Sequence, residues 1–338
     1  MSTLSRTTYS AINTFRNCPR KHHLRYEQHL APREKAAQLA FGSTIHRALE
    51  IWHDPTDPQR IERVLDYLDS AYPNLAHTPE EKAAWHLARA MALGYAKRYS
   101  QEEFYVVALE YEFAGDIRNP DTGARSQTFS MAGKVDGIVR IGEDFYLLEH
   151  KTAAALDGNY IEKLWADTQI ALYSHYLREL GFPIVGVLYN VLLKSRLQQR
   201  TGETEEEFEA RRTALAAKNR TGRSTAKRQE PETDLEFQAR LSDWYAKPEA
   251  FHREKIFLSE DRLAMLRDEV WEVTQQYLDA RRRGKWLLNT SHCFAWQRPC
   301  EYLPYCRSNG SPLIRDNLYE VRPPHEELET VSNSPEAF

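Results

Sequence analysis

Residues 133–152 have the sequence GKVDGIVRIGEDFYLLEHKT, and this stretch decides the fold. Apolar residues alternate with other residues on both sides of a turn sequence at 142–144, a pattern that predicts two β-strands joined as a hairpin. Glu149 and Lys151 are two positions apart, so their side chains point to the same face of the second strand. The hairpin therefore carries two opposite charges side by side.

Three charged residues of this hairpin are candidates for a functional site: Asp136, Glu149 and Lys151. Charged side chains at the end of an apolar strand lose hydration, which favours a compensating partner such as a metal ion. The simpler interpretation is a surface salt bridge on an edge strand. Taken alone, the Glu-x-Lys pattern favours that interpretation.

The composition indicates a soluble globular chain. It has 338 residues, of which 41% are hydrophobic and 28% are charged. No apolar run approaches the roughly 18 residues of a membrane span, and the first residues lack an apolar signal core. We therefore expect a cytoplasmic location and no membrane partner. The net charge of -4 gives no overall attraction to nucleic acid, so phosphate binding would need local basic patches.

The order of predicted elements indicates an α/β chain, α+β-like in layout, with a central mixed sheet flanked by helices. Strands are expected at 105–113, in the hairpin and at 184–193, and a helix separates the last two. We expect six segments: an N-terminal segment (1–40), a helical subdomain (41–104), the sheet core (105–193), a basic and polar insertion (194–252), a C-terminal helix with three cysteines (253–310) and a poorly ordered tail (311–338).

Two predicted helices carry further candidates. His46 lies beside an apolar stripe in the helix expected at residues 41–52, where a lone histidine is usually structural. Gln169 and Tyr173 are four residues apart and so share one face of the helix that follows the hairpin.

Basic residues gather in two places. Arg20, Lys21 and Arg25 lie in a basic, aromatic segment that could be a solvated helical turn or a phosphate-contacting surface. The insertion at 194–231 is also strongly basic, as are mobile loops and DNA-binding arms. Within it, ETEEEFEAR at 203–211 is echoed by ETDLEFQAR at 232–240, which indicates a local duplication.

The order of these residues resembles the RecB-type branch of the PD-(D/E)XK nuclease superfamily. In that branch an Asp on one strand and an E-x-K on the next are followed by a helix with Q-x-x-x-Y. The chain has Asp136, Glu149-His150-Lys151 and Gln169-x-x-x-Tyr173 in this order, with His46 before them. The resemblance implies a restriction-endonuclease-like core and spans about residues 10–306.

The resemblance also implies a catalytic centre. Asp136 and Glu149 are hard oxygen ligands suited to Mg²⁺ or Mn²⁺, and His46 and the backbone carbonyl of His150 would complete the shell. Lys151 would orient and help to deprotonate the attacking water, and a nearby cation would lower its pKa. Gln169 and Tyr173 would support the site and contact the DNA strand.

The four cysteines extend the resemblance to its iron-sulfur members, the CRISPR-associated exonuclease and the AddB-type subunit. There, one N-terminal and three C-terminal cysteines form a clasp around a 4Fe-4S cluster. Here these are Cys18, Cys293, Cys300 and Cys306, with a first C-terminal gap longer than in the best-known members. A structural Zn²⁺ held by four thiolates, or cysteines without a ligand, are the alternatives.

The function implied is a metal-dependent DNA exonuclease for single-stranded DNA or duplex ends, in phage or bacterial recombination and repair. An endonuclease with the same site and a non-catalytic DNA-binding module with a structural metal clasp are the alternatives. DNA is the expected partner. The sequence has no Walker A motif, so unwinding would need a helicase, or a recombination or annealing protein would present open ends.

Overall fold

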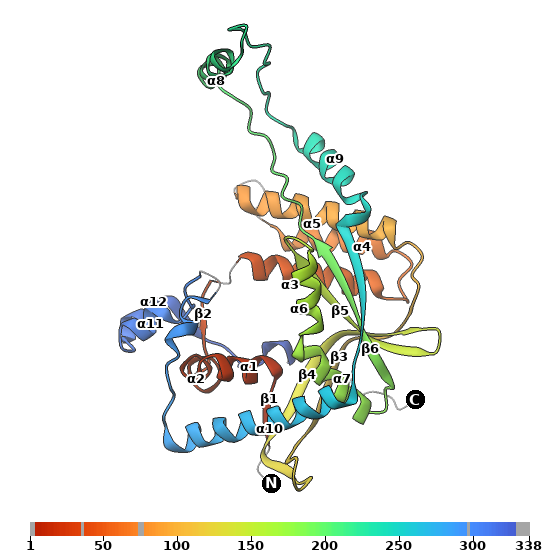
Figure 1. Cartoon of the computed structure of the whole chain (residues 1–338), viewed down its shortest axis with the longest axis vertical. Helices are drawn as coiled ribbons and strands as arrows, with labels where there is room; N and C mark the ends of the chain where they lie inside the picture. Colours follow the sequence, from red (N-terminus) through yellow and green to blue (C-terminus); the bar gives the residue numbers. More distant parts are fainter. Residues whose placement is uncertain (1–3, 35–36, 74–77, 296–297, 329–338) are drawn as a thin grey trace.

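The computed structural model describes residues 4–34, 37–73, 78–295 and 298–328. Its centre is a six-stranded mixed sheet in the order β1-β4-β5-β6-β7, with β3 paired to β4 (Figure 1). The strands are β1 (Ser5–Thr7), β3 (Tyr105–Arg118), β4 (Arg125–Ile141), β5 (Asp144–Ala153), β6 (Ile184–Leu193) and β7 (Phe251–Phe257). The predicted mixed sheet flanked by helices is confirmed.

The opening stretch forms the predicted hairpin between β4 and β5. The two strands pair antiparallel, with Ile138 opposite Leu147. Gly142 makes the turn at φ 62°, a conformation that glycine adopts without steric cost. β4 is longer than the hairpin and begins at Arg125. Beyond the hairpin, β5 pairs parallel with β6 through two connecting helices, α6 (Gly158–Trp165) and α7 (Thr168–Glu179).

Helices on one face of the sheet build the larger core. Here α7, α10 (Glu260–Arg283) and α1 (Tyr9–Asn17) pack on side chains such as Ile138, Leu147 and Val191. Because strand side chains alternate, Glu149 and Lys151 follow Leu147 on this face. The two charged residues of β5 therefore point toward α7.

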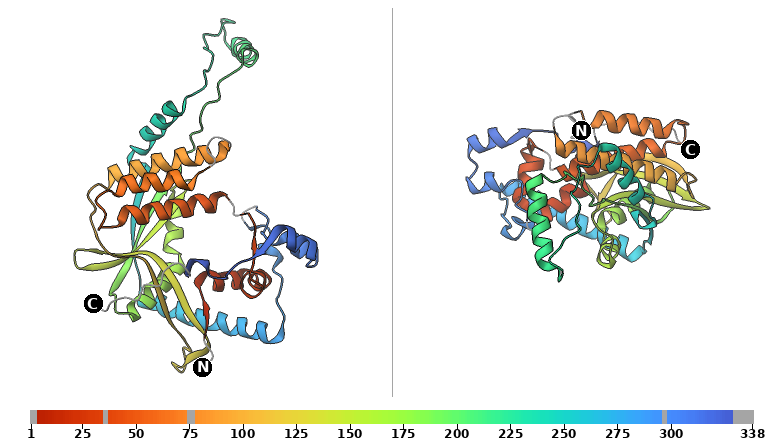
Figure 2. Two further views of the ribbon diagram at one scale, coloured as in Figure 1. Left: turned by 180° about the vertical axis from the view of Figure 1, so that it is seen from behind. Right: turned by 90° about the horizontal axis from the view of Figure 1, so that it is seen from above.

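A second layer of helices covers the other face. It consists of α3 (Ala37–His53), α4 (Arg60–Ala71), α5 (Pro79–Arg98) and α9 (Asp234–Tyr245), and it packs on Leu192 and Phe251 of the sheet (Figure 2). His150 and Asn190, which face each other on β5 and β6, point into this layer. The limits proposed for a helical subdomain at 41–104 stay a prediction.

The expected tail at 311–338 is ordered as far as Leu328, so that prediction was wrong for its first part. Residues 312–328 contain α12 (Pro312–Leu318), β8 (Tyr319–Val321) and a 3₁₀ turn at Glu326–Leu328. β8 pairs antiparallel with β2 (Leu30–Pro32), and Tyr319 is buried against Tyr302 with stacked rings. This burial outweighs the polar composition that suggested disorder. Residues 329–338 lie outside the described part.

The insertion after β6 forms a projecting arm. It leaves the sheet as an extended segment, turns through α8 (Glu205–Lys218) and returns to α9 (Figure 1). None of the residues of α8 is buried. Within the described residues, no helix has both the length and the apolar character that a membrane span requires.

Gly186 provides a test of the packing between β6 and β7. A Cβ on Gly186 would collide with the backbone carbonyl of Ile256, which cannot move without disturbing β7. We expect Gly186→Ala to lower the free energy of unfolding by about 1–3 kcal/mol, the usual cost of overpacking. Urea denaturation followed by circular dichroism measures it. Gly158→Ala, where nothing lies within 4 Å of the added Cβ, is the control. Equal midpoints for the two variants would contradict the prediction.

Candidate active site

Four of the predicted site residues meet where β4 and β5 stop pairing with each other. Asp136 lies on β4, Glu149 and Lys151 lie on β5, and His46 lies on α3. Since Ile138 is opposite Leu147, the next pair on the same face consists of Asp136 and Glu149. The fold also brings His46 to this pair, although it is 90 positions from Asp136 in the sequence. His46 Nδ1 is 3.2 Å from Asp136 Oδ1.

Asp136 is held by hydrogen bonds to both of its carboxylate oxygens. His46 bonds to Oδ1, and the backbone N–H of His150 donates to Oδ2 over 2.8 Å. Burial alone would raise the pKa of Asp136, but the charge of His46 and these hydrogen bonds outweigh it and lower the pKa. The pKa of His46 is raised, because the attraction of Asp136 exceeds the effect of burial. Each residue of the pair therefore stabilises the charged form of the other.

Glu149 and Lys151 form a second ion pair on the adjacent strand. Lys151 Nζ donates to Glu149 Oε1 at 2.5 Å and lies 3.9 Å from Asp167 Oδ2. Glu149 is 7% exposed, and burial followed by repulsion from Asp136 raises its pKa. Although burial would lower the pKa of Lys151, the carboxylates of Glu149 and Asp167 raise it. The lowering expected from a bound cation would have to overcome these charges.

Asp167 is a site residue that sequence reasoning missed. Its side chain caps α7 by accepting from the backbone N–H of Gln169 at 2.9 Å. The same carboxylate hydrogen-bonds the buried Tyr189 and attracts Lys151. Its signal in the sequence was its position as an N-cap residue before a helix. That signal does not reveal that the cap also holds the lysine.

Gln169 and Tyr173 lie on the face of α7 that packs on the sheet. Gln169 Nε2 donates to the Tyr173 hydroxyl over 3.4 Å, and the Tyr173 ring packs edge-on against Phe113 with centroids 4.9 Å apart. Tyr173 is only 4% exposed. Its burial argues against direct DNA contact by the ring and favours a role in supporting the site.

A buried polar network lies on the face of the sheet opposite to Glu149 and Lys151. His150 Nδ1 bonds to Asn190 Nδ2 at 2.9 Å, and Asn190 Nδ2 also donates to the Tyr95 hydroxyl at 2.9 Å. Arg253 donates to the same hydroxyl at 2.9 Å and forms a bidentate ion pair with Glu102. The network thus connects β5, β6 and β7 to α5. Sequence reasoning missed it, because its members are far apart in the chain and individually ordinary.

The direction of the hydrogen bonds at Tyr95 follows from its neighbours. Asn190 Nδ2 and Arg253 can only donate, so the Tyr95 oxygen accepts from both. Its own proton is then directed to His53 Nε2, which lies 3.1 Å away. Burial keeps the pKa of His53 well below its usual value, so this ring is neutral and can accept. His53 and His46 both lie on α3, which the network therefore anchors beside the site.

The donor set fits a hard divalent cation in its chemistry. The buried carboxylate of Glu149 and the half-buried carboxylate of Asp136 repel each other, and a cation between them would relieve that repulsion. Their oxygens are engaged instead with His46, the His150 amide and Lys151. Accordingly, no three His, Cys, Asp or Glu side chains in the described part converge closely enough to hold a metal ion. Metal binding would require these side chains to exchange partners.

The four cysteines line one pocket, although Cys18 is about 275 residues from the others in sequence. His292 and Lys21 line it too. The backbone N–H of Lys21 donates to Cys18 Sγ at 3.5 Å, and that of Cys300 donates to the Cys293 carbonyl at 2.7 Å. None of the four forms a disulfide. Burial raises the pKa of the Cys300 thiol to about 11, so ligation of a metal would include loss of a proton.

The predicted phosphate contacts Arg20, Lys21 and Arg25 lie beside this pocket. Lys21 pairs with Glu301 at 2.9 Å, Arg25 donates to the Pro323 carbonyl at 3.2 Å, and the side chain of Arg20 hydrogen-bonds Cys306. All three therefore join the two ends of the chain. Their contact with DNA stays a prediction.

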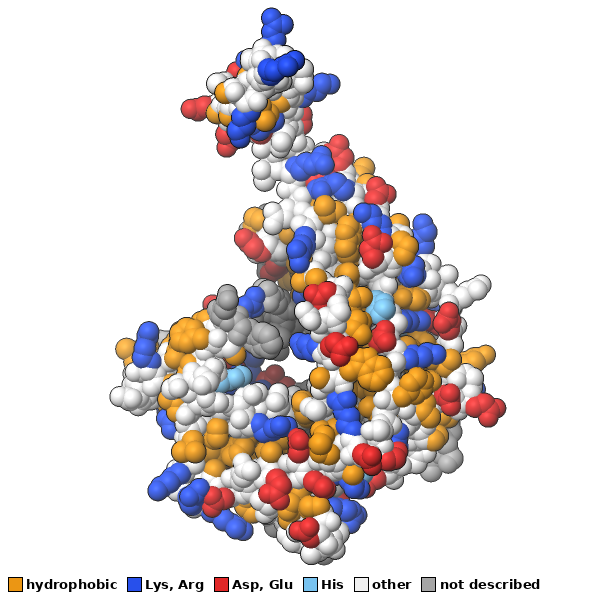
Figure 3. All heavy atoms as spheres, viewed as in Figure 1, with side chains coloured by type: hydrophobic (Ala, Val, Ile, Leu, Met, Phe, Trp, Pro, Cys, Tyr) orange, Lys and Arg blue, Asp and Glu red, His pale blue; other side chains and the backbone are white. Residues whose placement is uncertain are grey.

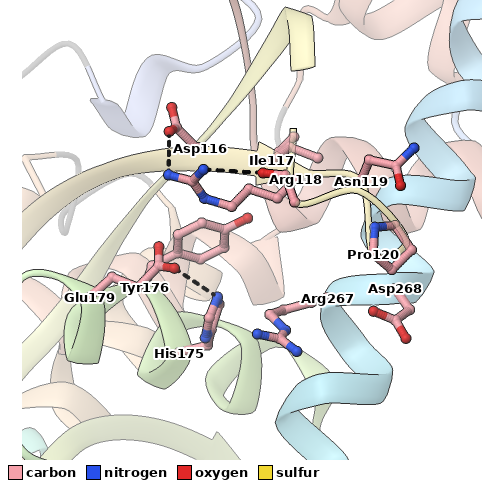
Figure 4. A pocket seen from close by; sticks show the side chains of 11 residues that line it. Asp116, Ile117, Arg118, Asn119, Pro120, His175, Tyr176, Glu179, Arg267 and Asp268 are labelled. Carbon is pink, nitrogen blue, oxygen red and sulfur yellow. Dashed lines mark hydrogen bonds and ion pairs between the residues drawn. The ribbon is translucent and has the colours of Figure 1, made fainter. Parts of the chain in front are cut away.

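A separate pocket lies between the β3–β4 turn, α7 and α10 (Figure 4). Asp116, Arg118, His175, Glu179 and Arg267 give it a mixed charge, and two of its ion pairs join neighbours on one element: Arg118 with Asp116, and His175 with Glu179. None of the predicted site residues lines it. It is therefore distinct from the candidate active site between β4 and β5.

The sheet, its helical cover and the two carboxylates between β4 and β5 define an α/β protein with a cluster of charged residues at the sheet. The sequence profile of the PD-(D/E)XK nuclease superfamily matches residues 6–307. The chain belongs to the PD-(D/E)XK nuclease superfamily. No curated protein matches the chain.

Tyr95 tests the buried network. Tyr95→Phe removes one oxygen and leaves the buried donors of Asn190 and Arg253 and the acceptor of His53 short of a partner. We expect a loss of about 1–3 kcal/mol in unfolding free energy, the cost of unsatisfied buried polar groups. Chemical denaturation is the measurement. Tyr105→Phe, at a residue that is 71% exposed, is the control. A Tyr95→Phe protein as stable as the control would contradict the network.

Proposed function

We propose that the chain is a metal-dependent DNA exonuclease of the RecB-type branch, acting on single-stranded DNA or on duplex ends. One observation carries the proposal. Glu149, which is buried, lies beside the half-buried Asp136 and Lys151 on β4 and β5, and His46 from the separate helix α3 bonds to Asp136. A structural ion pair would need only two of these residues, and burying the extra carboxylate beside Glu149 costs stability. Superfamily membership gives that costly arrangement a purpose.

The residues of the chain would divide the chemistry as follows. Mg²⁺ or Mn²⁺ held by His46, Asp136, Glu149 and the His150 carbonyl would supply positive charge that stabilises the transferring phosphoryl group. Lys151 would orient the attacking water, and Glu149 and Asp167 hold its ammonium group from two sides. Gln169 and Tyr173 would keep α7 in position against the sheet.

The shape of the molecule favours an exonuclease over an endonuclease. Figure 3 shows an opening between the lobe that carries the cysteines and the body that carries the sheet. An opening bounded on both sides admits a strand most simply from a free end. An endonuclease with the same site is the alternative, and so is a DNA-binding module without catalysis. Pathway and partner proteins, a helicase or a recombination or annealing protein among them, belong to the proposal.

Within this proposal the four cysteines that line one pocket would hold a 4Fe-4S cluster, which would require their thiols to move closer together. Cys18 precedes a segment that includes β2, and the three other cysteines precede β8, which pairs with β2. A cluster held by all four would therefore strengthen a junction that the strands already make. Structural Zn²⁺ is the alternative ligand.

Lys151 tests the catalytic assignment. We expect Lys151→Ala to lower the rate of DNA hydrolysis by about 10²–10⁴-fold, the usual contribution of a positioned acid–base group. Degradation of end-labelled single strands with Mn²⁺ measures it, using 5′-blocked and 3′-blocked strands to give the polarity. Lys255→Ala, an exposed lysine on β7, is the control. Activity of Lys151→Ala within threefold of the control would exclude the proposed role. Cleavage of circular single strands would favour the endonuclease.

The metal in the clasp has its own test. Protein purified without oxygen should be brown, absorb near 400 nm and contain about four iron and four sulfide ions per chain. We expect Cys306→Ser to lose this absorbance and to melt at a lower temperature, because the thiolates also join the chain ends. One zinc per chain without colour would replace the cluster with a zinc site. Wild-type protein that holds neither metal would leave the clasp without a ligand.

A further inference from the structure

The projecting arm, residues 194–233, begins at the end of β6, beside the candidate active site. The backbone N–H of Lys194 donates to the carbonyl of Ala153 at 2.7 Å, two residues beyond Lys151. From there the chain runs outward to α8 and back to α9 (Figures 1 and 2). The arm therefore extends from the place where DNA would be cut.

The echoed sequences at 203–211 and 232–240 build a rigid base for the arm. In each copy a Thr and a Glu form a capping box, Thr204 with Glu207 and Thr233 with Glu236. In each copy the first Glu pairs with the Arg eight residues later. The two copies therefore begin their helices in the same way.

The copies also bind each other across the base. The N–H of Glu203 donates to the Gln229 carbonyl, and the N–H of Glu232 donates to the Arg200 carbonyl, both at 2.9 Å. In return, the N–H of Gln229 donates to the Glu203 carboxylate and that of Arg200 donates to the Glu232 carboxylate. Glu203 and Glu232 are 29 positions apart in the sequence, and so are Arg200 and Gln229. The base therefore has a local two-fold arrangement. Such reciprocal bonds hold the two extended segments together.

This base uses the acidic residues of the arm. Glu203 pairs with Arg211, Glu205 with Arg228 and Glu209 with Arg212, while Glu207 completes its capping box. The negative charges of Glu203, Glu205 and Glu209 are therefore matched by arginines close to the base and along α8.

The tip of the arm has the opposite balance. Between Glu209 and Glu230 the sequence has seven basic residues and no acidic one. Three of the seven form the ion pairs above. The other four are exposed and pair with no acidic side chain in the described structure: Lys218, Arg220, Arg223 and Lys227. A turn with Gly222 at φ 63° and a hydrogen bond from Asn219 Nδ2 to the Arg223 carbonyl presents them together.

The reach of the arm sets the length of substrate that could touch its tip. The outgoing segment from Lys194 to Thr204 is about ten residues long and spans at most about 35 Å if extended. One strand of DNA advances about 3.4 Å per nucleotide. At this spacing the base of the arm lies at most about ten nucleotides from the cut, and the tip lies beyond the base, past α8.

We propose that the four cations of the tip bind the phosphate backbone of the substrate away from the scissile bond, where a strand of only a few nucleotides does not reach them. This inference rests on the proposed nuclease function and adds a length requirement to it. A polyanion suits the tip, because four exposed cations close together in the sequence attract negative charge and form no ion pair with an acidic side chain of the described structure. Backbone phosphates supply that charge without any requirement for sequence.

Binding measurements with strands of two lengths test this inference. We would replace Lys218, Arg220, Arg223 and Lys227 with Gln in the inactive Lys151→Ala protein, so that the probe is not cut. A matched protein has the same loss of charge at four exposed residues away from the arm: Lys97, Arg98, Arg282 and Lys285. Fluorescence anisotropy with labelled single strands of about 30 and about 6 nucleotides, at about 50 to 200 mM salt, gives the affinities.

We expect the arm variant to bind the long strand about 10–100-fold more weakly at low salt. Its slope of log K against log salt should be shallower by about 3, since each phosphate contact with a single strand contributes about 0.7. Its affinity for the short strand should equal that of the unmodified arm. The matched protein should bind both strands within about twofold of its parent.

Three outcomes would overturn the inference. Equal weakening for both lengths, or an equal effect of the matched charges, would mean that only net charge matters. Unchanged affinity for the long strand would mean that the tip serves another partner, such as an acidic protein surface. By contrast, wild-type protein that neither binds nor cuts any DNA would refute the proposed function itself. Circular dichroism of each variant excludes misfolding as the cause.

Discussion

The buried carboxylate of Glu149 and the half-buried carboxylate of Asp136 lie on the same face of neighbouring strands, and their mutual repulsion is the constraint that the surrounding structure has to satisfy. His46 and the His150 amide stabilise the first, and Lys151 stabilises the second. Asp167 in turn restrains Lys151 from the end of α7. The compensating groups come from α3, from β5 and from the start of α7, so the charges are compensated only when α3, α7 and the hairpin are all in place. The site is thereby coupled to the fold.

Much of this centre could be predicted from the sequence, because its signals are local. Alternation within β5 put Glu149 and Lys151 on one face, and helical spacing put Gln169 beside Tyr173. The tertiary partners had no comparable signal. Asn190 is one polar residue in an apolar strand, and Tyr95 is one aromatic residue in a long helix. Only the pairing of β5 with β6, and the packing of α5 over both, bring them to His150. No local pattern encodes contacts across 40 or 95 positions.

The chain ends illustrate the same limit in the opposite direction. The polar composition after residue 310 suggested disorder, yet β8 pairs with β2, and Tyr319 is buried against Tyr302. A few aromatic residues are enough to order such a segment when a strand edge is already available to it. The cysteines lie at this junction, where a shared ligand would add a bond between segments nearly 300 residues apart. Stability of the closed chain and occupancy of the cysteine pocket should then change together.

The arm uses charge in a different way from the candidate active site. In the candidate active site, opposite charges are largely removed from water and matched one by one, because unmatched charge in a low dielectric is costly. In the arm, matching is confined to the base and α8, where Glu203 and Glu232 fix two equivalent helix starts. The tip keeps its cations in water, where leaving them unpaired costs little. A duplication that fixes the base therefore leaves the tip sequence unconstrained by folding, so its positive charge is better explained by a ligand than by stability.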